Sequence, residues 1–349
     1  MWKFLESEMK VILGLTENAS RTDAEIADLF SLKKGTVASI RRRLLDAGAI
    51  AYVNVPAFNK LGCELLGFHM GTTEPSERAD TRANHYIEFT GKNPQIFHGM
   101  IGGTSVVFYT AFKSATELDS FVQNHNSFFT GSRRSSKGRM SSAVFPFALS
   151  KFTRVPNFAS IVHNHFQLDL PEPKVVQVTL AEVESLDLSE TERMTLVSLV
   201  EHPRSSDREI AANVGLSRQA VTRIRNKLIE NGILTMVCIP RLYKWGFEIC
   251  AIAHPKFNME IPWDKRLKTQ PRECVDRSFL SLSKADEAVA NYIFARYSDY
   301  SEGAESILAW YLKAKAFDEK PEITLFPLER CTELRTFDYG PAVRHLLLA

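Results

Sequence analysis

A gapless internal repeat is the feature that most constrains what this chain can fold into. The segment from Asp23 to Gly67 aligns without insertions with the segment from Asp207 to Ala251. About one position in three is identical between the two segments, which is far above chance and indicates a duplication. The chain is therefore predicted to contain the same folded module twice.

Each copy carries the sequence signals of three short helices. Thr22 and Glu25, like Ser206 and Glu209, have the spacing of a capping box, in which a hydroxyl and a glutamate satisfy free N–H groups where a helix begins. The third helix has a buried stripe, Val37, Ile40 and Leu44 in one copy and Val221, Ile224 and Leu228 in the other. Gly48 and Gly232 stand where a left-handed residue would end that helix. Three such helices followed by a strand predict a winged helix-turn-helix.

A winged helix contacts DNA by placing its third helix in the major groove. In the second copy the positions away from the core include Gln219, Arg223 and Asn226, which can form paired hydrogen bonds to base edges. In the first copy they include Gly35 and Ala38, which offer almost none, but basic residues surround them and suit phosphate contact. The candidate DNA-binding residues are Lys33, Lys34, Ser39, Arg41, Arg42, Arg43, Arg218, Gln219, Thr222, Arg223 and Asn226. The alternative is that these are solvated faces of a protein-interaction scaffold.

The segments that follow the two modules also match each other. "YVNVPAFNKLGCELLGFHM" and "MVCIPRLYKWGFEICAIAH" both run from a strand through a proline and a Lys-apolar-Gly turn into a second apolar strand. This junction resembles that of the feast/famine (Lrp/AsnC) transcription regulators. The resemblance implies an α+β fold of two tandem repeats, each a winged helix-turn-helix followed by a ferredoxin-like β-α-β-β-α-β domain.

A length of 349 residues exceeds one ordinary core and agrees with several domains. The predicted winged helices are residues 1–60 and 188–244, and the predicted ferredoxin-like domains are 61–165 and 245–349, joined by a linker at 166–187. Because family members usually carry one copy and dimerise, the resemblance implies an intrachain pseudo-dimer that forms a homodimer or a higher oligomer. It further implies double-stranded DNA as the partner and leaves open a small-molecule effector of unknown identity.

The sequence departs from the family at the turn between the second and third strands of each sheet. The family usually has a Gly-x-aromatic-Asp turn there, near its effector pocket. Here "IGGTSVV" lacks the aromatic-Asp pair and "LSKADEAVA" has no glycine. We therefore expect no amino-acid site around Lys284 to Glu287.

Siroheme decarboxylases are similar in fold and supply a rival interpretation. His98 lies on a predicted strand where such an enzyme could use a histidine against a tetrapyrrole carboxylate, but the accompanying tyrosine and arginine pattern is missing. A structural role for His98 is the simpler interpretation. "HNHF", from His163 to Phe166, has two histidines and no third ligand nearby, so a linker is favoured there over a metal site.

The remaining patterns exclude several other functions. Five scattered cysteines form no C-x-x-C pair, which argues against zinc and disulfides and favours a reducing cytoplasm. No apolar run is long enough to span a bilayer. The net charge of +2 means that DNA affinity depends on local basic patches, one of which is the predicted loop "TGSRRSSKGRM". No nucleotide loop, nucleophile elbow or carboxylate pair is found, so we expect no catalytic residues, no cofactor, no metal and no enzyme.

Overall fold

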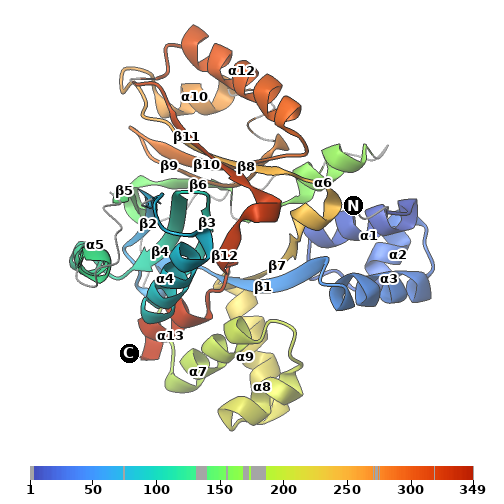
Figure 1. Cartoon of the computed structure of the whole chain (residues 1–349). Helices are drawn as coiled ribbons and strands as arrows, with labels where there is room; N and C mark the ends of the chain where they lie inside the picture. The colour runs from blue at the N-terminus through green and yellow to red at the C-terminus, as the bar shows by residue number, and fades with distance from the viewer. Residues whose placement is uncertain are drawn as a thin grey trace. The chain divides into compact units, whose positions relative to one another are not determined.

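Figure 1 shows the computed structural model of the chain, which divides into two compact units. The structure describes residues 4–73, 75–130, 140–154, 156–167, 173, 186–269, 271, 274, 276–317 and 319–348. Unit 1 comprises Met1–Tyr52, Ser150–Thr179 and Met236–Glu329, and unit 2 comprises Val53–Leu149, Leu180–Thr235 and Arg330–Ala349. Each unit therefore combines segments from both halves of the sequence.

Each unit contains one three-helix module. The helices are α1 (Glu6–Glu17), α2 (Asp23–Phe30) and α3 (Lys34–Asp46) in unit 1, and α7 (Glu190–Glu201), α8 (Asp207–Val214) and α9 (Arg218–Glu230) in unit 2. The predicted capping boxes are present. Thr22 Oγ1 accepts from the Glu25 N–H at 3.2 Å and Ser206 Oγ accepts from the Glu209 N–H at 3.3 Å. The helices therefore begin where the hydroxyl and glutamate spacing predicts.

A strand follows each module, β1 (Ile50–Pro56) after α3 and β7 (Leu234–Pro240) after α9. Gly48 and Gly232 precede these strands with φ of 58° and 61°, the left-handed conformation in which a side chain would be strained. The Arg241 N–H donates to Ala49 O at 2.9 Å within unit 1. Each helix-turn-helix thus continues into the strand expected of a winged helix.

The sheet of unit 2 has five strands in the order β12-β3-β4-β2-β5. They are β2 (Leu65–Thr72), β3 (Ile96–Gly102), β4 (Ser105–Phe112), β5 (Met140–Pro146) and β12 (Thr332–Arg335). Its helices are α4 (Ala79–Lys92), α5 (Ala115–Thr130) and α13 (Gly340–Leu348). Phe89 and Phe121 from the first two helices pack against Phe108 and Phe112 of β4, and all four side chains are almost fully buried. Burial of large aromatic side chains such as these contributes strongly to the stability of a core.

The sheet of unit 1 also has five strands, in the order β11-β8-β10-β9-β6. They are β6 (Lys151–Arg154), β8 (Ile249–His254), β9 (Ser278–Ser283), β10 (Ala288–Phe294) and β11 (Glu322–Pro327). Its helices are α6 (Ala159–Phe166), α10 (Trp263–Thr269) and α12 (Tyr297–Lys313). Short 3-10 helices occur in both units: η1 (Phe58–Leu61) and η2 (Phe147–Leu149) in unit 2, η3 (Leu242–Trp245) in unit 1, and η4 (Leu328–Arg330) where the two units join along the chain. In each half the order of elements is the predicted winged helix followed by β-α-β-β-α-β, so the expected fold class is confirmed.

The short strand at the end of each half pairs with a strand from the other half, which we did not expect. The expected β-α-β-β-α-β domain ends in one strand, but in the first half the segment "SSAVFPFALSKF" is divided into β5, η2 and β6. Strand β6 pairs with β9, which comes from the second half, and β12 pairs with β3, which comes from the first half. Each exchanged strand covers an edge that would otherwise expose unpaired backbone groups. The helix after each strand, α6 or α13, was not predicted, and "HNHF" lies in α6 rather than in a linker.

Candidate functional sites

The outward face of α9 carries the polar side chains predicted to contact DNA. Val221, Ile224 and Leu228 are buried on the opposite face, as the stripe predicts. Arg218, Gln219, Arg223 and Asn226 are exposed, and Thr222 is half-buried. With Lys227 and Glu230, they border a hollow of about 660 Å³. The helix therefore presents a continuous row of hydrogen-bonding groups to its outside.

An ion pair fixes α9 against α8. The Arg225 Nε donates to Asp207 Oδ1 at 2.7 Å, and the Arg225 Nη2 donates to Ser205 O at 3.2 Å. Thr222 Oγ1 donates to the second oxygen of Asp207 at 2.5 Å. Both charged side chains are about four-fifths buried, with exposed fractions of 18% and 20%. Thr222, predicted as a DNA contact, is thus occupied within the module.

The first copy has the same ion pair with one contact fewer. Arg41 Nε lies 2.9 Å from Asp23 Oδ1, and Arg41 Nη2 donates to Arg21 O at 2.7 Å. Ala38 stands at the position of Thr222 and has no hydroxyl. Arg41, another predicted DNA contact, therefore holds α3 against α2.

The other basic residues of α3 are mostly free of contacts. Arg43 pairs with Glu8 at 2.5 Å, whereas Lys33, Lys34 and Arg42 form no side-chain hydrogen bond or ion pair within the part of the chain that the structure describes. Ser39 is exposed beside them. The role of these residues in DNA binding remains a prediction. Arg133, Arg134, Lys137 and Arg139 of the predicted basic loop lie outside the described residues.

His98 has the environment of a structural histidine. Its ring stacks on Phe337 at 4.1 Å, its Nδ1 lies 3.0 Å from Arg335 O, and its side chain is almost completely buried. Burial lowers the pKa of His98 to about 4, so the ring is neutral at pH 7. No group of three or more His, Cys, Asp or Glu side chains with metal-binding geometry occurs among the described residues, which include His163 and His165.

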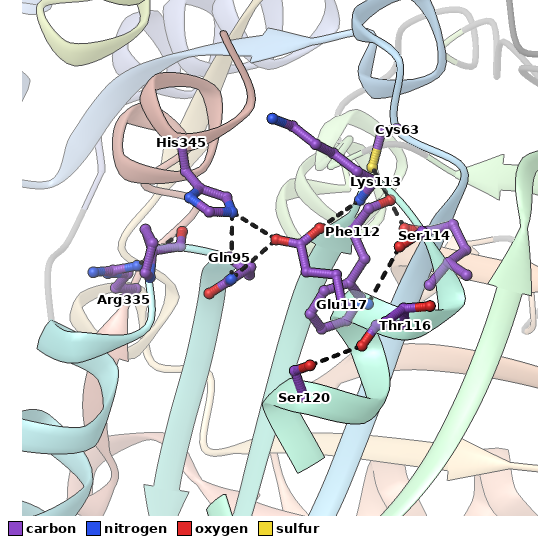
Figure 2. Close-up of polar contacts among 12 residues, drawn as sticks. Cys63, Gln95, Phe112, Lys113, Ser114, Thr116, Glu117, Ser120, Arg335 and His345 are labelled. Atoms are coloured by element: carbon purple, nitrogen blue, oxygen red, sulfur yellow. Dashed lines mark hydrogen bonds and ion pairs between the residues drawn. The ribbon is translucent and has the colours of Figure 1, made fainter. Parts of the chain in front are cut away.

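A polar cluster in unit 2 was not predicted from the sequence (Figure 2). His345 Nε2, on α13, lies 2.6 Å from Glu117 Oε1, and Gln95 Nε2 donates to the same oxygen at 3.0 Å. The Lys113 N–H donates to Glu117 Oε2 at 2.7 Å. Burial raises the pKa of Glu117, but the hydrogen bonds from Gln95, Lys113 and His345 outweigh it and leave the pKa below its usual value. The cluster therefore holds a charged carboxylate where α13 meets the sheet.

The sequence carries one local signal at this cluster, because Ser114 and Glu117 have the spacing of a capping box. That box is present, since the Glu117 N–H donates to Ser114 Oγ at 3.3 Å. Its partner His345 is separated from Glu117 by 228 positions along the chain. Only the packing of α13 brings the two together.

The turn without glycine, between β9 and β10, is filled by charged side chains. Glu287 pairs with Lys284 at 2.7 Å and with His254 at 2.7 Å. Burial raises the pKa of Glu287, but these partners outweigh it and lower the pKa overall. The groups that could bind an amino acid here are thus already paired with one another.

Comparisons with known proteins support the winged helix and extend the fold to the whole chain. The family "Winged helix-turn-helix DNA-binding" matches residues 188–235. No curated protein sequence matches the chain. The siroheme decarboxylase NirDL in complex with an iron-uroporphyrin III analogue is similar over 98% of this chain and 98% of its own, with a TM-score of 0.52 and 11% identity. A second NirDL structure has a TM-score of 0.51 and 14% identity over 97% of this chain and 98% of its own.

Single-copy regulators cover a smaller part of the chain. The leucine response regulatory protein LrpA of Mycobacterium tuberculosis matches 40% of this chain and 91% of its own, at 21% identity and a TM-score of 0.32.

The whole-length similarity to NirDL overturns one expectation. We expected that the chain is not an enzyme, but the structures that match it from end to end are those of a decarboxylase. That expectation was wrong in relying on short local motifs, because the similarity lies in the whole fold and not in such motifs. None of the described helices is both long enough and apolar enough to cross a membrane.

Proposed function

We propose that the chain is a sequence-specific DNA-binding transcription regulator with two unequal recognition helices. The observation that carries this proposal is the exposed row on α9 of Gln219, Arg223 and Asn226. The Arg225 and Asp207 ion pair fixes the helix that presents these side chains. The family match at residues 188–235 supports the same surface.

The chemistry of the row suits base contacts in the major groove. Arginine pairs with guanine, and asparagine or glutamine pairs with adenine, each through two hydrogen bonds. Because Arg223 and Asn226 are three positions apart, they lie on one face of α9 about one turn from each other. A side chain without a partner in the free protein gives up only water when it binds a base, so no internal contact is lost.

The first module has different outward side chains on α3, which suit another role in DNA binding. Its outward positions Gly35 and Ala38 cannot distinguish bases, while Lys33, Lys34 and Arg42 are exposed cations. Lysine and arginine without acid neighbours bind phosphates irrespective of sequence. In the proposed complex α9 therefore supplies the specificity and α3 supplies nonspecific affinity.

Selection of duplexes from a random pool tests this proposal. The full chain should enrich a defined sequence, and the variant Arg223→Ala/Asn226→Ala should enrich it much less. Lys313→Ala, which changes an exposed cation on α12, is the matched control and should enrich the same sequence as the unaltered chain. A pool that stays random after repeated selection contradicts the proposal.

Tetrapyrrole decarboxylation is a second candidate, favoured by the end-to-end similarity to NirDL. His98 is a poor candidate for its catalytic group because Phe337 covers the ring. The test is anaerobic incubation of the chain with siroheme, followed by mass analysis for loss of carbon dioxide. Unchanged siroheme and an unshifted absorption spectrum would reject this candidate without affecting the DNA-binding proposal.

A further inference from the structure

The two units have diverged at one equivalent place, where the helix after the exchanged strand meets the sheet. In unit 2 this place holds the cluster of His345, Glu117 and Gln95. Backbone hydrogen bonds identify the matching residues of unit 1. The Ala111 N–H donates to Gln95 O at 3.1 Å, and the Ile293 N–H donates to Arg277 O at 2.9 Å. Arg277 therefore occupies the position of Gln95.

The other two positions follow in the same way. Asp299 corresponds to Glu117, because it accepts the Arg296 N–H at 3.1 Å where α12 begins, as Glu117 accepts the Lys113 N–H where α5 begins. On the terminal helices, Val162 of α6 and Val343 of α13 are both fully buried and both donate to an aromatic residue four positions earlier, at 2.9 Å. Two positions further along, Asn164 corresponds to His345.

These residue differences leave open in unit 1 the position that the His345, Glu117 and Gln95 cluster fills in unit 2. Asn164 is shorter than histidine and carries no charge, and Asp299 is shorter than Glu117, so the ion pair of unit 2 has no counterpart between these two residues. A cleft of about 460 Å³ is found there instead. Its walls are Ile161, Asn164, His165, Gln167, Phe247, Asp276, Arg277, Ile293, Ala295, Arg296 and Asp299.

Two guanidinium groups on the cleft wall have no acidic partner among the residues that the structure describes. Neither Arg277 nor Arg296 forms an ion pair with any acid in the described ranges, and the Arg277 guanidinium lies 5.1 Å from the centre of the Phe294 ring. Asp299 is engaged by the backbone of the helix start, whose dipole also stabilises a carboxylate. Both guanidiniums thus have free donors, with Arg277 half-buried and Arg296 exposed at the cleft.

Part of the remaining wall is apolar, although Asn164, Gln167 and Asp276 also line the cleft. Phe247, Ile161 and Ile293 are joined by His165, whose ring lies 4.4 Å from that of Phe247. Burial lowers the pKa of His165, which favours its neutral form. A ligand that fits this cleft needs an anionic group at the arginines and a hydrocarbon part at this wall.

We propose that the cleft of unit 1 binds the carboxylate of a molecule that has an apolar body. A planar guanidinium can give a carboxylate two parallel hydrogen bonds, which also fixes its orientation. The cleft volume lies within the range of about 300–1,000 Å³ found for small-molecule sites. The carboxylate can belong to a free small acid or to a side chain of a larger molecule. The proposal does not depend on DNA binding.

Calorimetric titration of the full chain without DNA tests the proposal. The probes are benzoate and hexanoate as small acids with an apolar body and iron-uroporphyrin III as a large polycarboxylate, each at constant ionic strength set with chloride, and inorganic phosphate is titrated as a comparison anion. Saturable binding of at least one probe is expected, and Arg277→Gln should weaken it by about ten- to a hundredfold, as for loss of hydrogen bonds to a charged group. The probe that binds distinguishes a small acid from a larger molecule. Gln is tolerable at this position because unit 2 has Gln95 there.

Three further variants make the result decisive. Lys313→Gln removes an exposed cation elsewhere on α12 and should leave binding unchanged. Arg296→Gln alters the second guanidinium at an exposed site and should weaken binding, even if Arg277→Gln proves poorly folded. Asn164→His/Arg277→Gln installs two of the three residues of the unit 2 cluster, leaves Asp299 in place, and should abolish binding. Absence of binding by all three acids, binding unchanged in both arginine variants, or binding of inorganic phosphate alone would overturn the proposal.

Discussion

Asp207→Ala should loosen α9 more than Asp23→Ala loosens α3. Asp207 accepts hydrogen bonds from Arg225 at 2.7 Å and Thr222 at 2.5 Å, whereas among the described residues Asp23 pairs with Arg41 alone, at 2.9 Å. A hydrogen bond to a charged group contributes about 1.5–3 kcal/mol, and partial exposure reduces this figure. The free energy of local opening should fall by about 2–4 kcal/mol for α9 and by about 1–3 kcal/mol for α3.

Hydrogen exchange of the backbone amides measures these openings separately in the full chain. Since 1.4 kcal/mol is a factor of ten, protection of α9 should drop by about 30- to 1,000-fold in Asp207→Ala. Both aspartates are the first residue of their helix, so loss of their charge at the helix start is common to both variants and cancels in the comparison. In a chain that carries Thr222→Ala, which removes the hydroxyl that the first copy lacks, loss of Asp207 should reduce the protection of α9 only as much as loss of Asp23 reduces that of α3. Equal losses in the two modules, or no loss in α9, would refute the reasoning.

Three further predictions concern the sheets. Gly67→Ala should destabilise unit 2 by about 1–3 kcal/mol in urea unfolding, because the added Cβ would lie 2.6 Å from His69 Nε2 and from Thr110 Oγ1, and a stable variant would contradict the packing. Burial lowers the pKa of His69 to about 3 and that of His125 to about 4. Because the unfolded chain then binds protons more readily than the folded one, the free energy of unfolding should be constant above about pH 6.5 and should decrease as the pH falls towards 4. The decrease should reach up to about 1.4 kcal/mol per pH unit for each histidine. His125→Phe should reduce that slope by one proton, and an unchanged slope would contradict it. Calorimetry with the common amino acids should show no binding that depends on Lys284 or Glu287, because the two already pair at 2.7 Å.

The local parts of the fold could be predicted because their signals are local. The Thr22 and Ser206 capping boxes and the glycines at 48 and 232 act within a few residues of themselves, and the structure places them as expected. The exchange of β6 and β12 could not be predicted, since a four-residue strand carries no information about which distant edge it will cover.

The sites show the same limit. Exposure of Arg223 and Asn226 followed from helical periodicity, because the buried stripe defines the opposite face. The engagement of Arg41 by Asp23 did not follow, because charge alone does not reveal a partner in another helix. The cleft around Arg277 is lined by residues of α6, of β10, of the start of α12 and of the segments that precede β8 and β9. It could be recognised only when the position of Arg277 was compared with that of Gln95 in the structure.

Binding of selected and random duplexes to single-site variants tests the central claim most directly. Fluorescence anisotropy should show that Arg223→Ala costs about 1–3 kcal/mol on the selected duplex and little on random DNA. Arg42→Ala should weaken both duplexes alike and reduce the salt dependence by a slope of about one. Lys313→Ala should change neither affinity. Loss of sequence preference in Arg42→Ala with preference retained in Arg223→Ala would reverse the assigned roles, and unchanged DNA affinity in both variants would contradict DNA recognition by α9.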